Sequence, residues 1–119
     1  MGERRPERVA HLVQAEIAGW LLRDAKDPRL QRVTVTGVRM SPDLRHARVF
    51  VRTLGGRDRA EALRALGGAG HALRGAVARA LALRVTPELH FEWDATPDRA
   101  ARVDALLRGD RPGDDEGSE

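Results

Sequence analysis

The sequence contains no cysteine and no tyrosine, and its aromatic residues are limited to two phenylalanines and two tryptophans. The absence of cysteine excludes disulfide bonds, thiolate metal ligands and cysteine nucleophiles, and it is consistent with a reducing compartment. No apolar run approaches the roughly 20 residues that a membrane-spanning helix needs. The first residues also lack the apolar segment of a secretory signal peptide. These absences predict a cytoplasmic protein that is neither secreted nor embedded in a membrane.

The residues that are present predict one folded domain with an aliphatic core. Apolar residues make up 41% of the 119 residues, and most of them are alanine, leucine or valine. Such small side chains allow helices to approach closely. Charged residues make up 33% of the chain, which is typical of a well-solvated globular surface. A chain of this length supports one ordinary domain, which we expect to span residues 1–108.

Charge is distributed unevenly along the chain. Residues 1–86 carry 17 basic and 8 acidic residues, whereas residues 87–119 carry 4 basic and 10 acidic ones. The net charge of +3 therefore combines a body of +9 with an end of −6. A basic body indicates a polyanionic partner such as nucleic acid. From charge alone, the arginine-rich composition of a genome explains the same surface equally well, since 20 of the 21 basic residues are arginine.

The first half of the chain predicts a helix followed by a β-hairpin. Apolar residues recur at helical spacing over residues 5–24, and Asp27-Pro28 then ends the helical pattern. Residues 33–40 and 46–53 alternate as two strands joined by a short turn, which predicts antiparallel pairing. The alternation shifts by one position at Gly37, where a β-bulge would keep the apolar side chains on one face.

The second half predicts a glycine-interrupted helix, a third strand and a short helix. Residues 58–82 favour a helix, but Gly67-Gly68-Ala69-Gly70 contains three glycines, each costing about 1 kcal/mol relative to alanine. This segment is therefore expected to be two helices or one kinked helix. Residues 89–93 alternate as a strand, and a short helix follows with Thr96 as its N-cap. Residues 109–119 are expected to be a disordered acidic tail.

This order of elements predicts an α+β fold. The elements follow in the order helix, strand, strand, kinked helix and strand. The three strands build one sheet, and the helices cover one of its faces. The kinked helix is the crossover that returns the chain to the sheet. The other face of the sheet is expected to be open to solvent.

Several spaced motifs make the sequence similar to a known family. They are Asp27-Pro28-Arg29-Leu30, Ser41-Pro42-Asp43-Leu44, Ala47-Arg48-Val49-Phe50-Val51 and the segment from Pro87 to Asp94. In type and order these motifs resemble the bacterial ribosome-binding factor A family, and the similarity runs from about Arg5 to Leu107. The resemblance implies a KH-like domain of the second topological type. It also implies a monomeric, non-catalytic factor that binds the free small (30S) ribosomal subunit during late maturation of 16S rRNA.

The resemblance also locates the expected kink. The family replaces the GxxG loop of other KH domains with an Ala-x-Gly kink, which aligns with Ala69-Gly70-His71. Histidine therefore stands at the family's glycine position, and a glycine precedes it. We expect the kink to comprise Gly68, Ala69, Gly70 and His71.

Basic residues in two segments are candidates for contacts with rRNA phosphates. One group surrounds the hairpin turn, and the other is expected on the helix that follows the glycines. The candidates are Arg39, Arg45, His46, Arg48, Arg74, Arg79 and Arg84. If the helix packs beside the sheet, the two groups would form one basic surface. Any single arginine among them is also explained as an ordinary surface charge.

Other kinds of site find little support in the sequence. The glycines interrupt a helix and no lysine follows, unlike a nucleotide-binding P-loop. The four histidines include no i, i+4 pair for zinc, and no catalytic constellation is visible, so we expect no metal, no cofactor, no small-molecule substrate and no enzymatic activity. With four aromatic residues, all expected in the core, a base-stacking sheet is excluded. The alternatives are a general KH-like RNA-binding module and an adaptor whose acidic end contacts a protein.

Overall fold

Three strands form one mixed sheet in a computed structural model that describes residues 5–109 of the chain. The strands are β1 (Val33–Met40), β2 (His46–Thr53) and β3 (Glu88–Trp93), in the spatial order β1-β2-β3. β1 and β2 pair antiparallel as the expected hairpin, while β2 and β3 pair parallel. Parallel neighbours need a long crossover, and α2 (Arg59–Leu81) supplies it.

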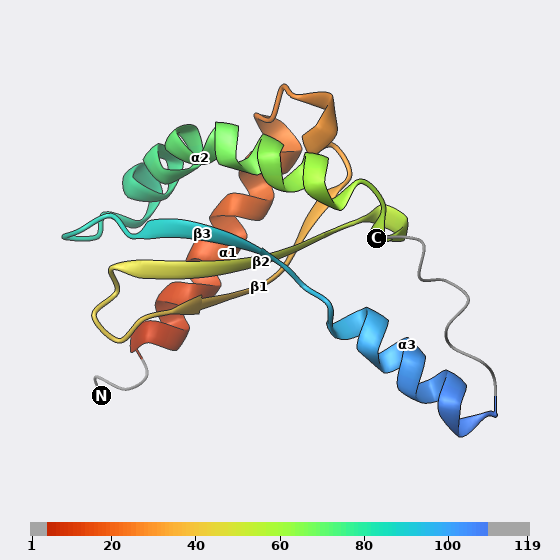
Figure 1. The fold of residues 1–119 in the computed structure, drawn as a ribbon. Coiled ribbons are helices and arrows are strands. Elements are labelled where there is room, and N and C mark those ends of the chain that lie inside the picture. The colour runs from red at the N-terminus through yellow and green to blue at the C-terminus, as the bar shows by residue number, and fades with distance from the viewer. Residues whose placement is uncertain (1–4, 110–119) are drawn as a thin grey trace.

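Two helices cover one face of the sheet and leave the other open (Figure 1). α1 (Arg5–Arg23) packs against β1 and α2, and α2 packs against β2 and β3. α3 (Thr96–Leu107) extends away from this body. Two short 3-10 turns, Pro28–Leu30 and Leu54–Gly56, connect the larger elements. The expected α+β fold with helices on one face is confirmed.

The core between the helices and the sheet is aliphatic, as the composition predicts. Apart from Pro87, its fully enclosed side chains are valine, leucine, isoleucine and alanine; they include Val13, Ile17, Leu30, Ala47, Val49, Val51, Leu66, Leu73 and Val77. Trp20 and Phe91 are partly buried and pack against this core. The prediction that all four aromatic residues belong to the core is wrong for Phe50, because Phe50 alternates with buried Val49 and Val51 and so lies on the open face.

The predicted bulge in β1 is confirmed. The pairing of β1 with β2 shifts register between Val35 and Gly37. Val33 and Val35 before the shift are buried, and Val38 and Met40 after it pack against the same core. The extra residue therefore keeps both halves of β1 facing α1, although their sequence parity differs.

Of the two expectations for the glycine segment, two helices or one kinked helix, the structure contradicts the first. α2 is one continuous helix through Gly67, Gly68 and Gly70, and Figure 1 shows it as a single ribbon that curves across the sheet. Glycine can adopt helical backbone, although at a cost relative to alanine, and Leu66 and Leu73 on either side are fully buried and anchor the helix to the core. The two-helix alternative is therefore wrong.

Some element ends differ from the sequence expectations. α2 ends at Leu81, where Ala82 takes a left-handed conformation, so Arg84 lies in the loop before β3 and not on the helix. The N-cap position of α3 is held by Ala95, and Thr96 is already helical. The side chain of Asp94 instead accepts a hydrogen bond from the Thr96 amide, at 2.9 Å.

Two expectations concern the chain as a whole. The acidic tail expected from residue 109 onward lies outside the described residues, except for Gly109. Among residues 5–109, no helix has the length and apolar character that crossing a bilayer requires.

Candidate nucleic-acid interface

The open face of the sheet carries a mixed polar surface from all three strands. Successive side chains of a strand point to opposite faces, so the residues that alternate with the core are presented together. They are Thr34, Thr36 and Arg39 on β1, His46, Arg48, Phe50 and Arg52 on β2, and Glu88, His90 and Glu92 on β3. Of the predicted phosphate ligands, Arg39, His46 and Arg48 belong to this face. The acidic residues of β3 lie beside them.

Arg48 is held by Glu92 across the β2–β3 pair. Its Nε donates to Glu92 Oε2 at 2.7 Å and its Nη2 donates to Oε1 at 2.9 Å. The hydrogen bonds from Arg48 lower the pKa of the Glu92 carboxyl below its usual range. The Arg48 guanidinium also lies 5.1 Å from the centre of the Phe50 ring, a cation–π contact. Arg48 is therefore already engaged within the sheet.

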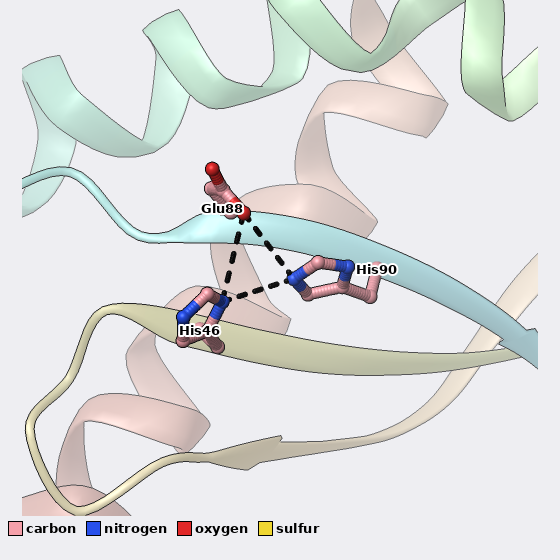
Figure 2. Close-up of side chains that lie close together, drawn as sticks. All are labelled: His46, Glu88 and His90. Carbon is pink, nitrogen blue, oxygen red and sulfur yellow. Dashed lines mark hydrogen bonds and ion pairs between the residues drawn. The ribbon is translucent and has the colours of Figure 1, made fainter.

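His46 is part of a second cluster that also joins β2 to β3. His46 Nδ1 lies 3.1 Å from His90 Nε2, and both nitrogens lie 3.6 Å from Glu88 Oε1. Figure 2 shows these three atoms turned toward one another on the open face of the sheet. Within residues 5–109, this is the one group of histidine and acidic side chains whose ligand atoms converge closely enough for a metal ion.

The β1–β2 turn presents Arg45 at the end of the sheet. Asp43 accepts a hydrogen bond from Ser41 Oγ at 2.6 Å and another from the Arg45 amide at 3.0 Å. These bonds, that from Ser41 first, hold the pKa of the Asp43 carboxyl below its ordinary value. Asp43 thus shapes the turn, as its residue type predicts, and leaves the exposed Arg45 side chain to solvent.

Arg74 on α2 reaches the same end of the molecule as Arg45. Its Nη2 donates to the carbonyl of Thr86 at 3.1 Å, in the loop that leads into β3. Two residues later, the amide of Glu88 donates to the carbonyl of Arg45 at 2.9 Å. The loop before β3 therefore joins the hairpin turn to the C-terminal half of α2, and Arg84 is an exposed residue of this loop.

The seven candidates do not all share one surface. Arg79 is exposed on α2 and lines a hollow with Glu16, Trp20 and Asp24 of the α1 side, away from the open face. Within the described residues, Arg39, Arg45, Arg79 and Arg84 form no ion pair. We call Arg39, Arg45, Arg74 and Arg84 the turn-end arginines, because they lie on or beside the end of the sheet that carries the hairpin turn.

The sequence did not indicate two further groups of contacts. The guanidiniums of Arg52 and Arg59 lie 5.3 and 5.6 Å from the centre of the Trp93 ring. Asp94 accepts a 2.6 Å hydrogen bond from Thr36 Oγ1, and this bond contributes most to lowering the pKa of Asp94. Asp94, at the end of β3, is thus engaged in local structure. Its residue type was the only feature of the sequence that pointed to it, and it did not indicate this contact.

Comparison with known proteins identifies the family. The family model described as Ribosome-binding factor A matches residues 5–107, nearly the whole described domain. The chain belongs to the ribosome-binding factor A family. The resemblance seen in the motifs is therefore confirmed, and with it the expectation of a ribosome-binding factor that is not an enzyme.

Curated relatives and solved structures agree with this membership. The chain is 49% identical over 119 residues to the ribosome-binding factor A of Methylobacterium sp. (strain 4-46), covering 98% of this chain and 86% of the relative. The crystal structure of ribosome-binding factor A from Thermus thermophilus is similar at a TM-score of 0.66 and 32% identity, covering 73% of this chain and 93% of that one.

A second structure of the Thermus thermophilus protein shows what that protein binds. It consists of coordinates of a homology model fitted into a cryo-EM map of a complex with the 30S subunit. This chain matches those coordinates with a TM-score of 0.63 and 35% identity, covering 73% of this chain and 93% of that one. The α+β fold described above is thus the fold of solved ribosome-binding factor A structures.

Proposed function

We propose that this protein binds the free 30S subunit as a monomer during late maturation of 16S rRNA and that it acts in the cytoplasm, without a cofactor. The observation that carries the proposal is the match, over nearly the whole described domain, to a family with a member fitted into a 30S complex. The structure adds a chemical basis, because exposed arginines gather where the hairpin turn and the loop before β3 meet.

The turn-end arginines are the proposed contacts with rRNA phosphates. Arginine binds phosphate through a planar fork of N–H donors, and the exposed guanidiniums of Arg39, Arg45 and Arg84 have no acidic partner within residues 5–109. Arg74 uses one nitrogen for the Thr86 carbonyl and retains further donors. Arg39 is the Cα partner of Arg48 across the hairpin. It therefore extends the turn-end arginines onto the open face of the sheet.

Arg48, His46 and Arg79 have a weaker claim to phosphate contacts. Arg48 would have to give up two hydrogen bonds to Glu92, and His46 lies against Glu88 and His90. Arg79 faces Glu16 and Asp24 across a hollow. We therefore assign these three residues a secondary role, and we place the primary contact at the turn end of the sheet.

The proposed mechanism is recognition by charge and shape. Phosphate contacts fix where a protein sits on RNA but carry no base sequence, so the fit of the domain to a folded rRNA junction would supply selectivity. Binding at that junction would hold a maturing rRNA element until its surroundings fold. Nothing in this mechanism needs a bond to be made or broken.

The test is co-sedimentation with ribosomal particles from the same cell extract. The proposal predicts that the protein migrates with free 30S subunits and is nearly absent from joined ribosomes. Equal binding to 30S subunits, joined ribosomes and unrelated RNA would instead establish the alternative, a general RNA-binding module.

A matched pair of double variants tests the contact surface. Arg39→Glu with Arg45→Glu should weaken 30S binding and reduce the slope of log affinity against log salt by roughly 0.7–0.9 for each phosphate that is no longer bound. Arg32→Glu with Arg57→Glu changes the charge equally at the other end of the sheet, where the Leu54 amide binds the Arg32 carbonyl, and should change binding less. Equal effects in both variants would reject the turn-end surface.

A further inference from the structure

The His46, Glu88 and His90 cluster has the geometry of three corners of a metal site. The distances between the facing atoms are 3.1 Å for the two nitrogens and 3.6 Å from each nitrogen to Glu88 Oε1. A triangle with these sides has a circumscribed radius of about 2.0 Å, which is the distance at which zinc binds imidazole nitrogen and carboxylate oxygen. One ion can therefore reach all three atoms without movement of the backbone.

We propose that His46, Glu88 and His90 form a binding site for one zinc-class divalent cation on the open face of the sheet. Two imidazole nitrogens and one carboxylate oxygen are a donor set that suits zinc and its neighbours among the transition metals. At these distances the ion would lie in the plane of the three atoms, and rotation of the exposed Glu88 side chain to bring its oxygen to about 3.3 Å from each nitrogen would give three corners of a tetrahedron, with the fourth open to water. Hard cations such as Mg²⁺ prefer oxygen ligands and octahedral geometry, so this site selects against them.

The fold itself preorganises the three ligands. Glu88 is the Cα partner of His46 in the parallel β2–β3 ladder, and His90 is two residues further along β3 on the same face. The two strands therefore hold the side chains at neighbouring positions. His46, Glu88 and His90 have side chains that are 53%, 60% and 47% exposed, so an ion can enter from solution.

Two carboxylates lie close to the cluster, among the turn-end arginines. Asp43 in the hairpin turn interacts electrostatically with His46, and Glu92 does so with His90. Arg48, the Cα partner of His90, is one of the opposing charges, and Glu92 holds it through two hydrogen bonds. The cluster therefore has acidic as well as basic side chains around it.

The metal would also replace the hydrogen bond between the two rings. At 3.1 Å, one facing nitrogen must carry a proton to donate to the other. With metal bound, both facing nitrogens offer lone pairs and each ring keeps its hydrogen on the other nitrogen. Since the ligands must be free of protons, acid competes with the metal, and affinity is expected to fall as the pH is lowered.

The test is titration of the full, untagged chain with Zn²⁺. Calorimetry measures the binding, and NMR spectra monitor the ring signals of the histidines. We expect one equivalent to bind, with shifts in the signals of His46 and His90, and Mg²⁺ to leave both unchanged. His46→Gln, His90→Gln and Glu88→Gln should each weaken Zn²⁺ binding at least about tenfold. Circular dichroism checks that each variant keeps its fold.

His71→Gln is the matched control, because it removes an exposed histidine from α2 and leaves the cluster intact. Its affinity for Zn²⁺ should equal that of the unchanged chain. The proposal is overturned if Zn²⁺ binding is absent, if it survives in the double variant His46→Gln with His90→Gln, or if His71→Gln weakens it as much as the cluster variants do. None of these readouts involves the 30S subunit, so the site stands or falls independently of the proposed function.

Discussion

Arg48 and Glu92, 44 residues apart in the chain, form a two-point hydrogen-bonded ion pair that joins β2 to β3. Arg48 is also the Cα partner of Arg39 on β1, so two arginines stand side by side on the open face. Like charges in such positions repel, and Glu92 offsets part of that repulsion. The same carboxylate withholds Arg48 from an external phosphate.

Glu92→Gln is expected to strengthen 30S binding. The substitution removes the charge that holds Arg48, so its guanidinium becomes available beside Arg39. One additional bound phosphate steepens the salt dependence of binding by roughly 0.7–0.9 in the logarithmic slope. Binding measured at several salt concentrations gives this slope. Glu61→Gln, an exposed acid on α2, is the control, and an unchanged slope in Glu92→Gln would place Arg48 outside the RNA contact.

Thr36→Val is expected to reduce the part of the pH dependence of stability that arises from Asp94. The Thr36 hydroxyl holds the pKa of Asp94 below its ordinary value, so this bond stabilises the fold above that value and its contribution is lost as pH falls through the lowered pKa. Removing the hydroxyl should cost roughly 1 kcal/mol at pH 7. The difference from the unchanged protein should shrink at acid pH.

Urea unfolding at neutral and acid pH measures this effect. Thr34→Val is the matched control, because Thr34 is an exposed threonine two positions earlier on the same face of β1. It should lose less stability and keep the pH dependence of the unchanged protein. An equal loss in both variants would mean that Thr36 stabilises the fold as a strand residue and not through its hydrogen bond to Asp94.

Sequence patterns were sufficient for the elements and the layers because each pattern reflects which face is buried. The valines of β1 change parity at Gly37, and this alone located the bulge that the register confirms. Composition also predicted the aliphatic core. At α2 the glycine pattern left open two helices or one kinked helix, and the burial of Leu66 and Leu73 keeps the helix continuous. Tertiary packing outweighs propensity there.

The candidate site was less accessible to sequence reasoning because its contacts join different strands. The spacing of the histidines showed no i, i+4 pair, yet His46 and His90 meet across the β2–β3 ladder. Likewise, Arg48 counted as a free positive charge until Glu92 was found beside it. Such pairs depend on which strands are neighbours and in what register, and neither follows from residue types.

Leu73→Ala tests the packing that carries α2 across its glycines. Leu73 is fully buried, so the substitution removes apolar contacts and leaves a cavity, at a cost of about 2–5 kcal/mol. Chemical unfolding measures this loss. Leu22→Ala removes the same atoms from a side chain that is 89% exposed, and it should be nearly neutral; similar losses in both would contradict the assigned core.

Gly68→Ala separates the stability of α2 from any binding role of its glycines. Gly68 is helical, and a Cβ added there would meet nothing within 4 Å. Alanine should therefore stabilise the fold by about 1 kcal/mol, as measured by unfolding in urea. Gly55→Ala is the opposite control, because Gly55 has a φ of 75° that strains any other residue, and it should destabilise. If Gly68→Ala keeps 30S binding, the glycine is not needed for contact. Weaker binding by this more stable variant would show that the segment from Gly68 to His71 contributes to binding through flexibility or close approach to the partner.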